Sequence, residues 1–207
     1  MAVLLALACA GCTSAAEPAE PAVHSTATAA LPTSAGELEE LLLDDVPSGL
    51  PRVADDELDP PAGEKGADDV AAYAEDAAHQ EEVLGQYGYQ RGWERFWRGD
   101  GALTTVFVDQ FDDPAGAATY AEDLARNDAE FYGGQLDRSP AGLPGDCVLM
   151  TVEQPDPGHG MDGPAVFAWC GRGVFTVSVA AVRPGVEDAR AEVATVVAEQ
   201  LDRLPAP

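Results

Sequence analysis

Aromatic and arginine side chains alternate in one segment of the chain, in a pattern that suits the binding of a ligand or partner. The segment contains Tyr87, Tyr89, Arg91, Trp93, Arg95 and Trp97. Because successive strand residues point to opposite faces of a sheet, this spacing predicts that all six share one face. Guanidinium groups form cation–π contacts with aromatic rings, and both residue types are enriched at binding hot spots. The pattern also fits an interior face, with the tryptophans beneath a helix and the arginines extended towards surface carboxylates. We favour the interior interpretation and keep the six residues as the candidate binding face.

The sequence contains few residues that could support nucleophilic catalysis. It has neither a G-x-S-x-G nor an S-x-x-K motif, and its three histidines, His24, His79 and His159, lie in separate segments. Adjacent acidic pairs such as Asp55-Asp56 could act as acid and base, but among 37 acidic groups such pairs arise by chance. We therefore predict no catalytic residues and a non-catalytic role, with a secreted enzyme that uses acidic residues as the alternative.

The segment 158–163 matches the G-x-G-x-x-G pattern of dinucleotide sites. Such a site needs a strand before the glycines and a helix after them, whereas prolines surround this segment and a strand is expected to follow it. Asp156, His159 and Asp162 could coordinate a divalent cation, but nothing in so glycine-rich a loop fixes their geometry. We predict a solvated loop here, with no metal and no cofactor.

The beginning of the chain has the features of an export signal. An apolar stretch over residues 2–10 leads into an Ala-Gly-Cys step at Cys12, and it is too short to span a membrane. This step resembles the bacterial lipobox, in which the cysteine thiol receives a diacylglyceryl group. The resemblance implies a signal peptide over residues 1–11, lipidation of Cys12 and anchoring at the extracytoplasmic face of the cell membrane. Cys9 stands where the lipobox usually has leucine, and residues 8–10 could instead form an ordinary cleavage site that releases a secreted protein.

Residues 12–34 are predicted to form a disordered tether, because Ala, Thr, Ser, Pro and Glu without a hydrophobic period bury too little apolar surface to fold. A single folded domain is expected over residues 35–207. Cys147 and Cys170 remain in this domain, and an even pair in an exported protein favours a disulfide. Both lie in strand-like segments, where neighbouring strands can bring the sulfur atoms together. Two buried free thiols are the alternative.

The charge and hydropathy of the chain exclude several classes of partner. Its 207 residues include 37 acidic and 11 basic side chains, which give a net charge of -26. Nucleic acids and anionic lipid surfaces would repel such a chain at long range, so membrane contact is expected only through the lipid anchor. No apolar run approaches the roughly 20 residues of a membrane-spanning helix. An envelope protein or a small ligand remains as the class of partner.

The hydrophobic pattern predicts the elements that must position these residues. Helices are expected over residues 34–42, 68–85, 113–132 and 186–204, where capping residues precede apolar side chains at three- and four-residue steps. Strands are expected over residues 87–97, 103–111, 147–152, 165–170 and 174–182, with glycine-rich turns in two hairpins. This mixture, without repeated βαβ units, predicts an α+β fold with an antiparallel sheet of about five strands packed by helices on one face.

This order of elements resembles a PsbP-like α+β domain and is also similar to surface lipoproteins of actinobacteria. The resemblance covers roughly residues 37–204 and rests on the strand at 89–95, the helix start at 113–117 and the strand at 173–177. It implies a fold and an extracytoplasmic location, and it transfers no active-site residue. We therefore expect an exported, lipid-anchored cell-surface protein with a binding or structural role. A sensor or chaperone domain of the cell envelope is a further alternative.

Overall fold

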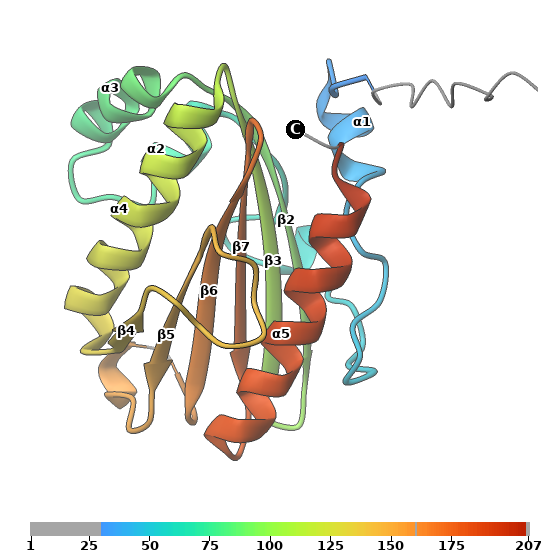
Figure 1. Cartoon of the computed structure of the whole chain (residues 1–207), viewed down its shortest axis with the longest axis vertical. Coiled ribbons are helices and arrows are strands. Elements are labelled where there is room, and N and C mark those ends of the chain that lie inside the picture. Colours follow the sequence, from blue (N-terminus) through green and yellow to red (C-terminus); the bar gives the residue numbers. More distant parts are fainter. Residues whose placement is uncertain (1–29, 160, 206–207) are drawn as a thin grey trace, which may run out of the picture.

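The computed structural model describes residues 30–159 and 161–205; the predicted signal peptide, Cys12 and the first part of the predicted tether lie outside them. The described chain folds around one antiparallel sheet of seven strands in the order β1-β2-β3-β7-β6-β5-β4 (Figure 1). The strands are β1 (Gly63–Lys65), β2 (Tyr89–Gly99), β3 (Ala102–Phe111), β4 (Gln135–Asp137), β5 (Cys147–Val152), β6 (Ala165–Arg172) and β7 (Phe175–Val182). The α+β class and the antiparallel sheet are confirmed, whereas the expectation of about five strands was too low.

The two strands that the sequence did not reveal are β1 and β4. Each has three residues and lies at an edge of the sheet, β1 beside β2 and β4 beside β5. Three residues are too few to show the alternation of apolar and polar side chains that identifies a strand. Each edge strand forms because the longer strand beside it offers free backbone N–H and C=O groups. No local sequence pattern indicates this pairing.

Helices cover both faces of the sheet, which corrects the expectation of a single covered face. The helices are α1 (Ala35–Glu39), α2 (Ala67–Ala71), α3 (Ala77–Tyr87), α4 (Pro114–Tyr132) and α5 (Val186–Arg203). Figure 1 shows α4 and α5 on opposite sides of the strands, and each contributes to a separate hydrophobic cluster. Strands β6 and β7 are buried at successive positions, so both of their faces need a covering helix. None of the helices among the described residues combines the length and apolar character that crossing a bilayer requires.

The larger core lies between α5 and the sheet. Val193 and Val197 of α5 and Val177 of β7 are fully buried in it. The same core contains the disulfide between Cys147 and Cys170, which face each other directly across β5 and β6. The predicted disulfide is therefore confirmed.

Helix α4 covers only part of the other face. The carboxylate of Asp113 accepts a hydrogen bond from the Gly116 N–H at 2.9 Å, Pro114 occupies the first turn, and Gly133 ends the helix with a φ of 66°. These boundaries agree with the predicted helix. The helix packs mainly against β5, β6 and β7, although the sheet continues through β3 and β2. Part of this face is therefore left for other elements to cover.

The helix predicted over residues 68–85 is in fact two helices, α2 and α3. Asp76 begins the second one, because its carboxylate accepts a hydrogen bond from the His79 N–H at 3.1 Å and so caps a new first turn. Helix α3 also continues past Gly85 and ends at Gly88, whose φ of 73° is left-handed. The break allows α2 to approach the sheet separately from α3.

Strands β2 and β3 form the predicted hairpin, and their register assigns each residue to a face. Asp100 and Gly101 make the turn with φ values of 50° and 76°. Arg95 pairs with Val106 on the face towards α5, whereas Glu94 pairs with Phe107 on the face towards α4. The odd-numbered residues from 103 to 111 therefore face α4.

Candidate functional site

The six residues of the candidate binding face do not share one face of the sheet. Tyr87 belongs to helix α3, and strand β2 begins only at Tyr89. The pairing of β2 with β3 shifts register between Tyr89 and Arg91, so residues on either side of this irregularity point to opposite faces. The rings of Tyr87 and Tyr89 both contact the ring of Tyr120 on α4, with centroid distances of 5.6 and 6.5 Å. The prediction of one shared face was wrong because it extended a regular strand across a helix end and a bulge.

The face towards α1 and α5 carries the other four residues, Arg91, Trp93, Arg95 and Trp97. Arg95 is 4% exposed and donates hydrogen bonds to the Leu43 carbonyl at 2.6 Å and to the Asp44 carboxylate at 3.2 Å. Trp97 is fully buried, and its Nε1 donates to the Asp44 carbonyl at 3.3 Å. The segment after α1 therefore covers these two side chains, and a ligand cannot reach them in this structure.

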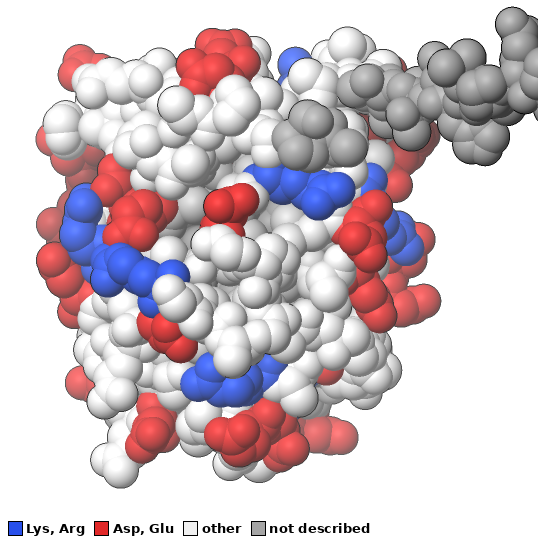
Figure 2. Space-filling model, viewed as in Figure 1, with Lys and Arg blue, Asp and Glu red and all other residues white. Residues whose placement is uncertain are grey.

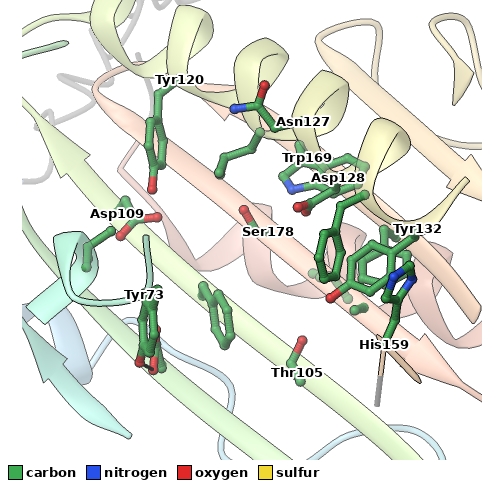
Figure 3. A pocket seen from close by; sticks show the side chains of 18 of the residues that line it. Tyr73, Thr105, Asp109, Tyr120, Asn127, Asp128, Tyr132, His159, Trp169 and Ser178 are labelled. Carbon is green, nitrogen blue, oxygen red and sulfur yellow. Dashed lines mark hydrogen bonds between the residues drawn. The ribbon is translucent and has the colours of Figure 1, made fainter. Parts of the chain in front are cut away.

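A cleft of about 720 Å³ opens on the opposite face of the sheet, in the space that α4 leaves uncovered. Its floor is made by β2, β3, β6 and β7, one wall by α4, and its ends by α2 and by the loop that contains His159 and Met161 (Figure 3). This volume lies within the range of about 300–1,000 Å³ that is usual for sites of small organic ligands. The sequence motifs gave no indication of it.

Aromatic rings form a row along one side of the cleft. Phe131 stacks on His159 at 4.4 Å between ring centroids, Tyr132 on Phe167 at 5.2 Å, and Phe167 on Trp169 at 5.7 Å. The row begins at Phe131, which is 56% exposed, and ends at Trp169, which is 3% exposed. A ligand that enters the cleft would therefore meet a continuous aromatic surface from the mouth inwards. We call these five side chains the aromatic row.

Three carboxylates line the cleft, and one of them is paired within the protein. Glu94 of β2 forms an ion pair with Lys65 of β1 at 3.3 Å, and both side chains are less than one-tenth exposed. The hydroxyl of Tyr73 also donates to Glu94 at 3.2 Å. Burial raises the pKa of the Glu94 carboxyl, while the Lys65 ammonium favours its ionised form. The charges of this pair balance each other at the end of the cleft near α2.

Asp109 of β3 is buried in the cleft with little hydrogen bonding. The Tyr89 hydroxyl lies 3.2 Å from Asp109 Oδ1 and 3.3 Å from the Lys65 carbonyl oxygen, so one proton serves two acceptors. No other described residue donates to this carboxylate. Burial raises the pKa of Asp109 to about 7, and the negative charge of Glu94 contributes to the rise. Asp109 therefore exchanges its proton near neutral pH.

Gly92 makes the approach of Tyr89 to Asp109 possible. It lies directly opposite Asp109 in the register of β2 and β3. A Cβ atom at this position would stand 2.3 Å from Asp109 Oδ1 and 2.5 Å from the Tyr89 hydroxyl oxygen, far inside van der Waals contact. Any larger residue would displace the carboxylate or the hydroxyl.

Two further polar side chains enter the cleft without a partner. Asp128 of α4 accepts no hydrogen bond and forms no ion pair with another described residue, and burial raises its pKa to about 6. Ser178 of β7 is 9% exposed, and its Oγ is buried without a hydrogen-bond partner among the described residues. Figure 3 shows Asp109, Ser178 and Asp128 directed into the same space. Because buried polar atoms are normally satisfied, this set is suited to a ligand that supplies hydrogen bonds.

The electrostatic environment of the cleft is negative. Among the described residues that line it, none is Lys or Arg. Acidic side chains outnumber basic ones by 37 to 11 in the whole chain, although Figure 2 shows both acidic and basic patches on one face of the molecule. A low-dielectric cleft whose lining carries charges of one sign concentrates ions of the opposite sign.

No sequence motif marked Asp109, Ser178 or Asp128 as site residues. The available signal was a polar residue at an inward position of an apolar strand, which applies to Asp109 in β3 and Ser178 in β7. Asp128 gave no such signal, because acidic residues are frequent on the helices of this chain.

Two of the three loop residues considered as metal ligands have other roles. His159 belongs to the aromatic row, and Asp156 accepts a hydrogen bond from the Gly158 N–H at 2.8 Å. In the part of the chain that the structure describes, no group of three or more His, Cys, Asp or Glu side chains is arranged to hold a metal ion.

The fold is similar to that of a solved extracellular domain. The crystal structure of the extracellular domain of PknH from Mycobacterium tuberculosis matches with a TM-score of 0.51 and 14% sequence identity. The match covers 84% of this chain and 99% of that chain. No family model and no curated protein matches the sequence. At this level of identity the similarity concerns the fold alone.

Proposed function

We propose that this chain is an exported binding protein whose cleft beside α4 takes a small organic molecule with an apolar body. The observation that supports this proposal best is the cleft of about 720 Å³, in which an aromatic row faces polar side chains that have no partner in the described part of the chain. Protein interiors are otherwise close-packed and hydrogen-bonded, so an open space of this kind needs a functional reason. An apolar pocket with a few convergent polar groups is typical of a ligand site.

A second candidate is a hydrolytic enzyme, and one observation favours it. The cleft contains two carboxyl groups whose pKa values are raised to about 7 and about 6, those of Asp109 and Asp128. Enzymes use pairs of carboxyl groups with separated pKa values as acid and base. We rank it below binding because the extended aromatic row suits the body of a ligand and provides no further group for chemistry.

Filling the cleft is expected to abolish ligand binding without unfolding the protein. Ala180 lies on the floor of the cleft, on β7, and a tryptophan there would occupy the space of a ligand. We expect the neutral fluorophore N-phenyl-1-naphthylamine to bind the native protein, and Ala180→Trp to weaken this binding by at least about tenfold. Fluorescence titration measures both affinities.

The control for this experiment is Ala198→Trp, which adds the same side chain at an exposed position of α5 on the other side of the sheet. Its affinity for the fluorophore should equal that of the native protein. Equal binding by all three proteins would place the fluorophore outside the cleft and contradict the proposal. Circular dichroism verifies that both variants are folded.

We further propose that the chain is anchored to the extracytoplasmic face of the cell membrane through Cys12. Three observations support this: the Ala-Gly-Cys step, a disulfide that suits an oxidising compartment, and a fold similar to an extracellular domain. We expect an alkyne analogue of palmitate to label the full chain in a bacterial host, and Cys12→Ala to lose the label. Cys9→Ala is the matched control and should keep it. Label retained by Cys12→Ala would contradict the anchor and leave the cleft proposal unaffected.

A further inference from the structure

We infer that the ligand of the cleft is an organic cation: an amine whose ammonium group binds near Asp109, Ser178 and Asp128 and whose apolar body lies on the aromatic row. This inference rests on the proposed binding function and specifies the chemical class of the ligand. It follows from a count of charges, from the unpartnered serine and from the aromatic lining.

The charges of the cleft are not balanced within the protein. Lys65 neutralises Glu94, because the two side chains form a buried ion pair at 3.3 Å. Asp109 is 8% exposed and Asp128 is half-buried, and neither has a basic partner among the described residues. A buried carboxylate without a counter-charge is unfavourable, and a bound cation would supply the missing charge. An anionic ligand would instead add a further negative charge to the same space.

Three side chains of the cleft can accept hydrogen bonds from a ligand that carries donors. The carboxylates of Asp109 and Asp128 can accept hydrogen bonds, and so can the Ser178 hydroxyl, which has no partner among the described residues. An ammonium group carries up to three N–H donors and no acceptor, which matches this set. A carboxylate or phosphate ligand brings only acceptors and would place them beside the acceptor oxygens of Asp109 and Asp128.

The aromatic row provides the remaining part of the recognition. The faces of tryptophan, tyrosine and phenylalanine rings attract cations, and the rings also cover apolar surface. Trp169 lies at the buried end of the row and Phe131 at the mouth, so an elongated ligand can contact both. A bare metal ion would leave the row without a role, and the described residues offer no group of three ligands for one.

The test compares three molecules that share one skeleton and differ in the head group. They are 4-phenylbutylamine, 4-phenylbutanol and 4-phenylbutanoate, and calorimetry at pH 8 measures their affinity for the full chain. We expect the amine to bind at least about tenfold more tightly than the alcohol and the carboxylate to bind most weakly. The pH keeps the amine protonated and Asp109 ionised.

Variants then locate the head group. Asp128→Asn is expected to weaken amine binding by about five- to tenfold and to change alcohol binding by less than about twofold, because only the amine uses the charge. Glu130→Gln is the matched control, since Glu130 lies on the same helix, is exposed and does not line the cleft. It should leave both affinities unchanged.

The outcomes separate this inference from the proposed function. If the alcohol binds as tightly as the amine and Ala180→Trp weakens both, the cleft is a ligand site but the cationic class is wrong. If the amine is preferred and Glu130→Gln weakens it as much as Asp128→Asn, the preference comes from surface charge and the inference fails. If none of the three binds and the fluorophore binds equally to native protein and Ala180→Trp, both proposals are contradicted.

Discussion

Replacement of Arg183 by methionine is expected to lower the free energy of unfolding by about 3–5 kcal/mol, because it leaves a buried carboxylate without its counter-charge. Arg183 follows β7 and forms an ion pair with Glu192 of α5 at 2.8 Å, and the two side chains are 9% and 6% exposed. The guanidinium also donates to the Thr104 hydroxyl at 2.6 Å and to the Leu103 carbonyl at 2.7 Å. It therefore joins the start of β3, the end of β7 and α5. Urea denaturation measures the change.

A second substitution tests whether the unpaired charge causes this loss. In the double variant Arg183→Met, Glu192→Gln no charge remains, and the amide can still accept hydrogen bonds from Ser48 and Thr104. We expect the double variant to recover about 2 kcal/mol relative to Arg183→Met alone. Arg126→Met is the control, because this arginine is 54% exposed and its loss should change stability by less than about 0.5 kcal/mol. A double variant that is less stable than Arg183→Met would show that the charge is not the cause.

The Asp109→Asn variant is expected to gain stability relative to the native protein as the pH rises from 5 to 8. The pKa of Asp109 is raised from 3.8 to about 7 in the folded protein. Between pH 5 and 7 the folded protein therefore holds a proton that the unfolded chain has released, so increasing pH destabilises the native protein. The asparagine does not titrate. Between pH 5 and pH 7, the free energy of unfolding of Asp109→Asn should therefore rise by about 3 kcal/mol relative to that of the native protein. This corresponds to about 1.4 kcal/mol for each pH unit.

Urea denaturation of both proteins at pH 5 and pH 8 measures this difference and cancels the pH-independent effect of the substitution itself. Glu94, Lys65 and the other groups around Asp109 are present in both proteins, so the part of their titration that does not depend on the Asp109 charge cancels as well. Asp45→Asn is the control, because Asp45 is exposed and should show no such change between the two pH values. Equal stability differences at pH 5 and pH 8 would mean that Asp109 is ionised normally and is not the buried, unbalanced group that the ligand proposal needs.

Such a gain would also have a functional meaning. A buried carboxylate that destabilises the ligand-free protein at neutral pH contributes nothing to the fold. Its presence is understandable when a ligand supplies the counter-charge. The stability measurement therefore bears on the cleft without any knowledge of the ligand.

The parts of the fold that local patterns determine were predictable from the sequence. Helix α5 follows from apolar residues such as Val193 and Val197 at helical spacing, and helix α4 from the cap at Asp113 and the glycine at 133. The bond between Cys147 and Cys170 followed from two cysteines in neighbouring strand-like segments. In each case a small number of residues, recognisable by their type and spacing, determines the structure.

The candidate site was not predictable, because it depends on contacts between distant segments. The role of Glu94 depends on Lys65, which reaches it through a three-residue edge strand that has no sequence signature. The distribution of the β2 side chains over the two faces of the sheet depends on a bulge after Tyr89. Because of this bulge, Arg91 and the odd-numbered residues that follow it in β2 point to the opposite face from Tyr89. The space beside α4 exists because the helix packs mainly against β5, β6 and β7. No residue type in the sequence indicates this position.

If the cleft between α4 and the sheet holds an organic cation, nuclear Overhauser effects between 4-phenylbutylamine and the labelled protein will place the bound amine there. We expect cross-peaks from the phenyl group and methylene chain to the rings of Tyr132 and Trp169, and their loss in Ala180→Trp. Cross-peaks at saturating amine that involve only residues outside the cleft, such as Ala198 and its neighbours on α5, would contradict binding of the cation in the cleft.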